Sequence, residues 1–132
     1  MSWEALLAAA LDARSRAYCP FSRFAVGAAV ETESGALFAG CNVENRSYGL
    51  ALCAERSAIA AAVAAGHRSF RRLVVVAESS PPARPCGMCR ETLAEFCAPE
   101  LPILLASPAG ERHEVTLGEL FPLPFRFPPA QP

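Results

Sequence analysis

The chain has 132 residues and a mass of 14.0 kDa, which is enough for one domain with a hydrophobic core. Apolar residues make up 52% of it, which excludes a disordered polymer, and a net charge of −1 argues against the basic surface that binds a nucleic-acid backbone. No apolar run approaches the ~20 residues of a membrane span. We therefore expect a single domain over residues 1–132, with a flexible tail at 126–132, that binds neither nucleic acid nor a membrane.

The first segment, residues 2–18, has the pattern of an amphipathic helix. Ser2 is placed to cap it, and Glu4 suits the positive end of the helix dipole. Because charged residues interrupt the apolar positions, the segment is predicted to be a helix of the domain and not a signal peptide. Cys19-Pro20 is predicted to end it, since the residue before a proline is driven out of the helical region. The face predicted to be buried consists of Trp3, Leu6, Leu7, Ala10, Leu11 and Ala17.

The remaining elements alternate between strands and helices. Strands are predicted at 22–32, 36–43, 73–77, 103–106 and 111–115. Helices are predicted at 54–65, at 86–96 and, as one turn capped by Thr116, through Leu120. A hairpin followed by a β-α-β-α-β order favours an α/β fold with a single mixed sheet of about five strands and helices on both faces. The alanine-rich helix at 54–65 needs cover on more than one side, either from the first helix or from another subunit.

Two short stretches carry the chemistry, Cys53-Ala54-Glu55-Arg56 and Pro85-Cys86-Gly87-Met88-Cys89. Three thiolates leave one corner of a tetrahedral zinc ion open, which is typical of a catalytic rather than a structural site. A water in that corner becomes acidic enough to attack at neutral pH, and Glu55 is suited to carry its proton. Arg56 would donate to the sulfurs and offset the charge of −1 that three thiolates leave on Zn²⁺.

Simpler explanations exist for each stretch. A lone CxxC also fits a redox pair or half of a structural zinc site, and Arg56 alone would be interpreted as a solvated helix residue. The Cys53-x-Glu55 pair favours the catalytic interpretation, because residues two apart share a site only where the first lies at the loosened start of a helix. Six cysteines without a secretory signal indicate a reducing, cytoplasmic setting. A structural site would need a fourth ligand, for which the candidates are His67, His113, Cys41 and Cys97.

Taken together, these motifs resemble the small zinc-dependent cytidine deaminases. The resemblance covers residues 22–125 and is specific in combination. Its segments are Phe24-Ala25-Val26-Gly27-Ala28-Ala29, Asn42-Val43-Glu44-Asn45, Tyr48 with Cys53-Ala54-Glu55-Arg56, and Pro85-Cys86-Gly87-Met88-Cys89-Arg90.

The resemblance implies a three-layer sandwich with Zn²⁺ held by Cys53, Cys86 and Cys89 and with Glu55 as proton shuttle. In that family an activated water attacks C4 of the pyrimidine, and the glutamate carries protons to N3 and to the departing ammonia. The implied activity is hydrolytic deamination of cytidine or deoxycytidine to uridine or deoxyuridine in pyrimidine salvage. The implied assembly is a homotetramer with shared active sites. The implied substrate-binding residues are Phe24, Asn42, Glu44, Tyr48, Ala54 through its backbone N–H, and Phe125 from a neighbouring subunit.

Three positions depart from the family pattern: Arg46 replaces a small residue near the ligand, Glu91 replaces a glutamine, and Phe127 competes with Phe125 as the tail aromatic. Other functions on similar motifs are a blasticidin-S deaminase, an editing deaminase on RNA or DNA, and a structural zinc module that binds a partner protein. The ribose-type pair Asn42 and Glu44 favours a nucleoside, and the charge balance argues against the nucleic-acid enzyme.

Overall fold

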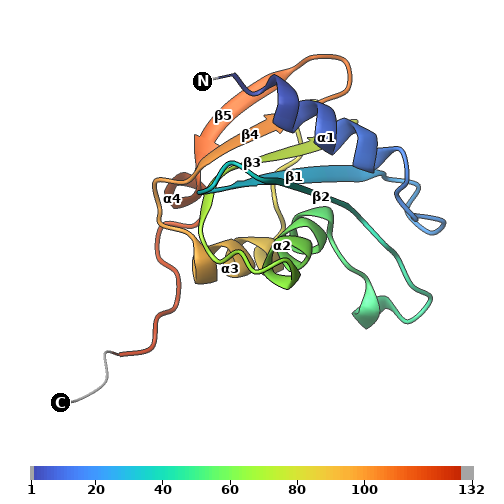
Figure 1. Ribbon diagram of the computed structural model, residues 1–132. Helices are drawn as coiled ribbons and strands as arrows, with labels where there is room; N and C mark the ends of the chain where they lie inside the picture. Colours follow the sequence, from blue (N-terminus) through green and yellow to red (C-terminus); the bar gives the residue numbers. More distant parts are fainter. Residues whose placement is uncertain (1, 129–132) are drawn as a thin grey trace.

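The computed structural model describes residues 2–128, which form one five-stranded mixed sheet with helices on both faces (Figure 1). The spatial order of the strands is β2-β1-β3-β4-β5. The strands are β1 (Val26–Thr32), β2 (Leu37–Cys41), β3 (Phe70–Ala77), β4 (Pro102–Ala106) and β5 (Arg112–Thr116). The helices are α1 (Glu4–Arg14), the 3-10 turn η1 (Tyr48–Leu50), α2 (Ala54–Ala64), α3 (Gly87–Phe96) and α4 (Leu117–Leu120).

The pairing of the strands follows from their connections. A short turn joins β1 to β2, and these strands are antiparallel. β1 also pairs with β3 in the antiparallel sense, and β4 pairs with β5 in the same way. β3 and β4 are parallel, which requires a crossover, and α3 supplies it. The predicted fold class, a mixed sheet of about five strands, is confirmed.

Three layers result, with α1 on one face of the sheet and α2 and α3 on the other (Figure 1). Alternate residues of β3 serve the two faces, as expected of a central strand buried on both sides. Val74 and Val76 pack with α1, whereas Leu73 and Val75 pack with α2 and α3. Because α1 covers the opposite face, it does not cover the alanine-rich helix α2, and that alternative is wrong.

Two glycines allow the helices to approach the sheet closely. A Cβ atom on Gly27 of β1 would lie 2.0 Å from the Ala10 carbonyl oxygen and 2.7 Å from Arg14 Cβ in α1. A Cβ atom on Gly40 of β2 would lie 2.6 Å from the Ala58 backbone nitrogen in α2. Both positions therefore require glycine for steric reasons.

Several predicted boundaries differ from the structure. α1 ends at Arg14 rather than Tyr18, because the chain turns back so that the Tyr18 carbonyl accepts a bond from the backbone N–H of Glu44 (2.8 Å). Leu11 is 37% exposed, and the buried face of α1 is formed instead by Leu6, Leu7, Ala10 and Ala13.

Of two predicted helix N-caps, the structure contradicts one and confirms the other. The N-cap of α1 is Trp3 and not Ser2, although the Ser2 hydroxyl accepts a bond from the Glu4 N–H (3.0 Å). The capping box of Thr116 and Glu119 at α4 confirms the prediction for that turn.

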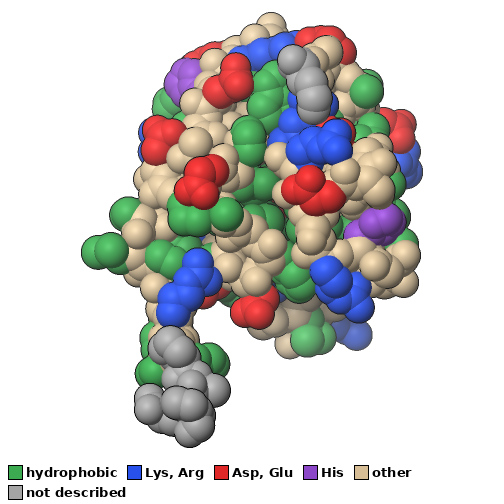
Figure 2. Space-filling model, turned by 60° about the vertical axis from the view of Figure 1, so that its left-hand side comes forward, with side chains coloured by type: hydrophobic (Ala, Val, Ile, Leu, Met, Phe, Trp, Pro, Cys, Tyr) green, Lys and Arg blue, Asp and Glu red, His purple; other side chains and the backbone are tan. Residues whose placement is uncertain are grey.

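The surface is of mixed charge, and the chain end lies away from the body of the domain. On the face drawn in Figure 2, acidic and basic side chains are interspersed, in keeping with the net charge of −1. After α4 the chain continues outward as an extended segment (Figure 1). The predicted flexible tail, 126–132, lies partly outside the described residues. Among the helices described for residues 2–128, none is long and apolar enough to cross a bilayer.

Candidate metal centre and active site

Three thiols meet where α2 and α3 begin. Cys53 is the N-cap residue of α2, Cys86 is the N-cap residue of α3, and Cys89 lies in the first turn of α3. The Cys86 sulfur lies 3.6 Å from each of the Cys53 and Cys89 sulfurs, and all three sulfurs lie within 4.8 Å of one another. Tetrahedral zinc with Zn–S bonds of about 2.3 Å needs sulfurs about 3.8 Å apart, so the spacing fits that ion.

Protonation within the trio is unequal before any ion binds. The hydrogen bond from Cys89, aided by the guanidinium of Arg56, lowers the pKa of Cys53 to about 5 against the effect of burial. The same hydrogen bond, together with burial, raises the pKa of Cys89. The Cys53 thiol, at the positive end of the α2 dipole, therefore ionises more readily than the Cys89 thiol.

Glu55 is a buried carboxyl beside the thiols. It lies in the first turn of α2 and is 5% exposed. Burial raises the pKa of Glu55, and the charge on Cys53 adds to this rise. A carboxyl whose pKa is raised in this way is suited to take up and release a proton during catalysis.

Arg56 links the Cys53 sulfur to the loop before α2. Its Nη2 donates to the Ala51 carbonyl oxygen (3.0 Å) and lies 3.8 Å from Cys53 Sγ. Its Nε is buried and has no hydrogen-bond partner among the described residues. This unpaired N–H belongs to a guanidinium group that contacts the Cys53 sulfur, so it is available to a further negative charge at the thiol cluster.

A cavity of about 300 Å³ opens beside the thiols and brings most of the predicted site residues together. Cys89 is buried behind this cavity and does not line it. The predicted residues that line it are Phe24, Asn42, Glu44, Cys53, Ala54, Glu55 and Cys86. The cavity is also lined by residues that were not predicted as site residues, namely Ser22, Val26, Val75, Ala83 and Arg84. Of these, Ala83 and Arg84 directly precede the Pro85-Cys86 motif, so their place in the chain was the available signal.

Asn42 and Glu44 hold the loop that forms one wall of the cavity. The Asn42 side chain accepts from the Val26 N–H (2.9 Å) and donates to the Phe24 carbonyl oxygen (2.8 Å). The Glu44 carboxylate accepts from the N–H groups of Phe21 and Ser22 (2.9 and 3.1 Å) and from the Ser22 hydroxyl. The bond from the Ser22 hydroxyl lowers the pKa of Glu44, which therefore remains ionised. These bonds also explain why β1 begins at Val26 and not at Ser22.

Two predicted substrate-binding residues lie outside the cavity of their own chain. Tyr48 is 77% exposed and packs edge-on against Phe21, with ring centroids 6.0 Å apart. Phe125 is 68% exposed and packs against Phe127, with centroids 5.2 Å apart.

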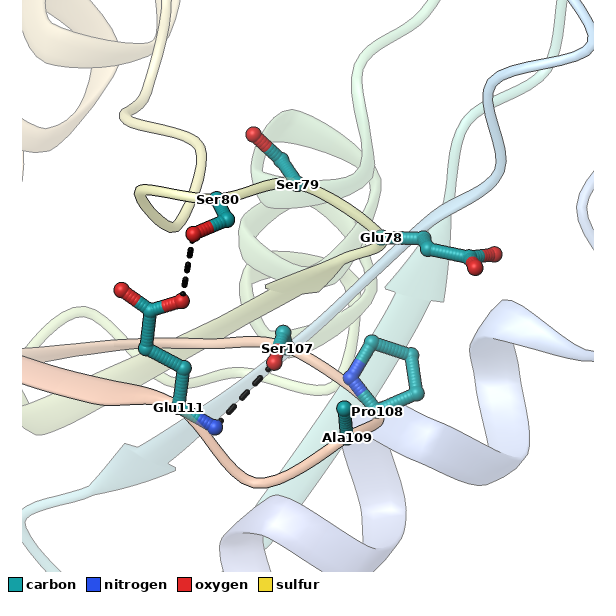
Figure 3. A pocket seen from close by; sticks show the side chains of 7 residues that line it. All are labelled: Glu78, Ser79, Ser80, Ser107, Pro108, Ala109 and Glu111. Carbon is teal, nitrogen blue, oxygen red and sulfur yellow. Dashed lines mark hydrogen bonds between the residues drawn. The ribbon is translucent and has the colours of Figure 1, made fainter.

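A second hollow, of about 440 Å³, lies beyond the carboxyl ends of β3 and β4 (Figure 3). The Ser80 hydroxyl donates to the Glu111 carboxylate (2.8 Å), and Ser107 Oγ accepts from the Glu111 N–H (3.1 Å). Within residues 2–128 the thiol trio is the one group of three or more side chains spaced to hold a metal ion, so this hollow has no comparable chemistry. It is lined by Glu78, Ser79, Ser80, Ser107, Pro108, Ala109 and Glu111.

Comparison with known proteins agrees with this geometry. The cytidine deaminase of Sporosarcina psychrophila is 45% identical over 92% of this chain and 90% of its own length. The blasticidin-S deaminase of Bacillus cereus is 32% identical over 76% of each chain. The crystal structure of cytidine deaminase from Burkholderia pseudomallei superposes with a TM-score of 0.91 and 46% identity, over 95% of this chain and 100% of that one. Residues 1–105 match the family model of the cytidine and deoxycytidylate deaminase zinc-binding region, and the chain therefore belongs to that family.

Proposed function

We propose that the protein is a zinc-dependent cytidine deaminase, which hydrolyses the 4-amino group of cytidine or deoxycytidine and releases ammonia. The observation that carries this proposal is the thiol trio at the edge of a cavity that also holds the buried Glu55 carboxyl. The high similarity to curated cytidine deaminases supports it. We propose that the protein serves pyrimidine salvage in the cytoplasm, a reducing setting in keeping with its free cysteines.

The metal would be held by Cys53, Cys86 and Cys89. When bound there, zinc supplies the acidity that makes water a nucleophile at neutral pH. Glu55 lines the same cavity and would take the proton of the attacking water and deliver it to N3 of the pyrimidine. It would then take the proton of the new C4 hydroxyl and pass it to the leaving amino group, so that ammonia departs as the C4 carbonyl forms. Arg56 donates to the Cys53 sulfur and lowers the negative charge of the thiolate cluster.

The nucleoside would lie between the loop wall and the metal centre. The backbone N–H of Ala54 binds the pyrimidine carbonyl oxygen, and Phe24 packs against the ligand. Asn42 uses its oxygen and one N–H to hold the wall, so its second N–H remains for a ribose hydroxyl. Glu44 accepts three bonds from the wall and has one lone pair left for the sugar.

A homotetramer would complete the site. The outer face of α2 exposes Ala60, Ala61 and Ala64, which nothing in residues 2–128 covers. Tyr48 and Phe125 lie outside their own cavity and are exposed, as expected of residues that act on a neighbouring subunit. We infer, from the place of Phe125 in the family pattern, that Phe125 rather than Phe127 shields the neighbour's site from water.

The deciding experiment measures zinc content together with ammonia release from cytidine, free cytosine and blasticidin S. We expect one zinc per chain, rapid release from cytidine, and little from cytosine, which lacks the sugar that Asn42 and Glu44 hold. Cys86→Ser should lose zinc and activity together, because an alcohol is a far weaker ligand than a thiolate. Full zinc content and full activity in Cys86→Ser would refute the metal assignment. Faster ammonia release from blasticidin S than from cytidine would refute the assignment of cytidine as substrate.

A further inference from the structure

Ser22 lines the catalytic cavity but has no part in the proton transfers proposed for Glu55. It belongs to the short segment 21–24 that precedes β1, and it borders the cavity together with Glu44. A serine in the wall of a cavity can be a passive spacer, so its hydrogen bonds decide whether it contributes to binding.

The Ser22 hydroxyl has a fixed direction. Its Oγ accepts from the Phe24 N–H (3.0 Å), and its proton goes to Glu44 Oε2. A backbone N–H can only donate and an ionised carboxylate can only accept, so one orientation of the hydroxyl satisfies both partners. The bond lowers the pKa of Glu44 and keeps that carboxylate ionised. The Ser22 hydroxyl is therefore committed to Glu44.

The bonds to Glu44 leave one acceptor position, and its place depends on Ser22. Each carboxylate oxygen has two lone pairs. Glu44 Oε1 accepts from the backbone N–H groups of Phe21 (2.9 Å) and Ser22 (3.1 Å), which occupy both of its lone pairs. Oε2 accepts from the Ser22 hydroxyl and retains one lone pair. With Oε1 anchored, the carboxylate can still pivot about that atom, and among the described residues the Ser22 hydroxyl is the donor that holds Oε2 in place.

The same bonds join the two residues proposed to hold the sugar. The Phe24 N–H donates to Ser22 Oγ, and the Phe24 carbonyl oxygen accepts from Asn42 Nδ2 (2.8 Å). Hydrogen bonds thus connect the Glu44 carboxylate through Ser22 and Phe24 to the Asn42 amide. The free lone pair of Glu44 and the second N–H of Asn42 are therefore an acceptor and a donor held at a fixed separation. Two vicinal hydroxyls, each able to donate and to accept, are a ligand group that matches this pair.

The backbone next to Ser22 adopts a conformation that favours these bonds. Arg23 has a φ of 59°, in the left-handed region that residues other than glycine rarely adopt. Its N–H donates to the Cys19 carbonyl oxygen (2.9 Å) and closes a turn. In this turn the backbone N–H and the hydroxyl of Ser22 both reach the Glu44 carboxylate. Backbone strain persists where surrounding contacts impose it, and here those contacts include the bonds to Glu44.

We propose that Ser22 is a positioning residue for sugar recognition, whose hydroxyl fixes Glu44 Oε2 and on which the preference for a ligand with vicinal sugar hydroxyls depends. This inference rests on the proposed deaminase function and on the assignment of Asn42 and Glu44 to the ribose. Ser22 acts through Glu44 and takes no part in the chemical step.

The test compares the affinities of the zinc-loaded protein for uridine and for 2′,3′-dideoxyuridine by calorimetry, because neither is deaminated and the second lacks both hydroxyls. The wild type should bind uridine more tightly. Ser22→Ala should lower the ratio of the two affinities about fivefold, as expected for one hydrogen bond, by weakening the binding of uridine alone. Ser22→Thr keeps the hydroxyl and should retain most of the ratio. With cytidine as substrate, Ser22→Ala should raise KM and leave kcat nearly unchanged, because the lost binding is the same in the ground state and the transition state.

The matched control is Ser107→Ala. Ser107 Oγ also accepts a backbone N–H in a turn, from Glu111 (3.1 Å), but it lines the other hollow, so the ratio should not change. An unchanged ratio in Ser22→Ala would overturn the inference. Equal weakening of both ligands would overturn it as well and assign Ser22 to the folding of the cavity wall, as would a fall in kcat at constant KM.

Two results with the wild type separate this inference from the proposals on which it rests. If cytidine releases no ammonia, the deaminase proposal fails, and the role of Ser22 fails with it. If cytidine is deaminated but uridine and 2′,3′-dideoxyuridine bind equally, the deaminase function stands, whereas the ribose assignment and the role of Ser22 both fail.

Discussion

At the scale of single residues, the site depends on which side chains are buried and which remain accessible. Glu55 is almost fully buried, yet it lines the cavity beside the Cys53 sulfur. Burial disfavours the ionised form of its carboxyl and raises its pKa, so the group can both accept and release protons during turnover. Cys97, by contrast, is partly buried against the core, where desolvation raises the pKa of its thiol to about 12 and so disfavours the reactive thiolate.

Glu55→Gln tests the proton-transfer role. We expect full zinc content, because Glu55 is not a ligand, and a loss of kcat of at least ~10²–10⁴-fold, since one group serves several transfers. Metal analysis and steady-state kinetics on cytidine check both. Near-normal turnover would instead favour a structural zinc module.

At the scale of elements, the metal centre depends on how α3 is fixed. Arg90 Nε donates to the Pro85 carbonyl oxygen (2.8 Å), and its Nη1 donates to the Leu120 carbonyl oxygen (2.6 Å). The residue just before Cys86 is therefore tied to the end of α4.

Arg90→Gln should loosen that turn and speed zinc release to a chelator about tenfold, in line with the effect of removing a residue that supports a metal ligand. Arg126→Gln is the control, because Arg126 bonds to the Ala94 carbonyl oxygen on the same helix without touching the metal loop (3.0 Å). Equal release rates for the two variants would contradict the role of Arg90.

The close approach of α1 to the sheet makes a separate prediction about stability. In Gly27→Ala the new methyl group meets backbone atoms of Ala10 and Arg14, so α1 must shift, which typically costs about 1–3 kcal/mol. Gly49→Ala is the control, because no atom would lie within 4 Å of the added Cβ and its change should stay within about 0.5 kcal/mol. Chemical denaturation of the two zinc-loaded variants measures the difference. A Gly27→Ala protein as stable as the control would show that the contact is softer than its distances indicate.

At the scale of the whole molecule, the described chain leaves aromatic side chains outside any cavity of its own. Phe125 and Phe127 pack only edge-on against each other, after the chain has left the domain. Exposed aromatic groups of this kind are common at protein interfaces. The proposed tetramer would bury them, and activity should then follow assembly.

Phe125→Ala tests this link. Sedimentation should show the wild type and the variant as tetramers, and the variant should have a raised KM for cytidine, because water then reaches the neighbouring site. Phe127→Ala serves as the control and should have a smaller effect. A fully active monomer at assay concentration would end the proposal.

Local patterns in the chain were enough to predict the chemistry and the order of elements. The pairs Cys53-x-Glu55 and Cys86-x-x-Cys89 were each predicted from short spacings at helix starts, because such patterns are properties of a few neighbouring residues. That the two pairs meet, 33 positions apart, is decided by the fold. The buried strand at 73–77 and the cap at Thr116 were likewise predicted from short patterns, since side-chain periodicity reflects local backbone geometry.

Which residues share the cavity, by contrast, depends on how the chain folds. Ser22 and Arg84 lie 62 positions apart in the chain and line the same hollow, which no local pattern indicates. The end of α1 at Arg14 likewise depends on the distant pairing of Tyr18 with Glu44. The cause is the same in each case: helical periodicity is set by neighbours, whereas the walls of a cavity are set by packing between segments that are remote in sequence.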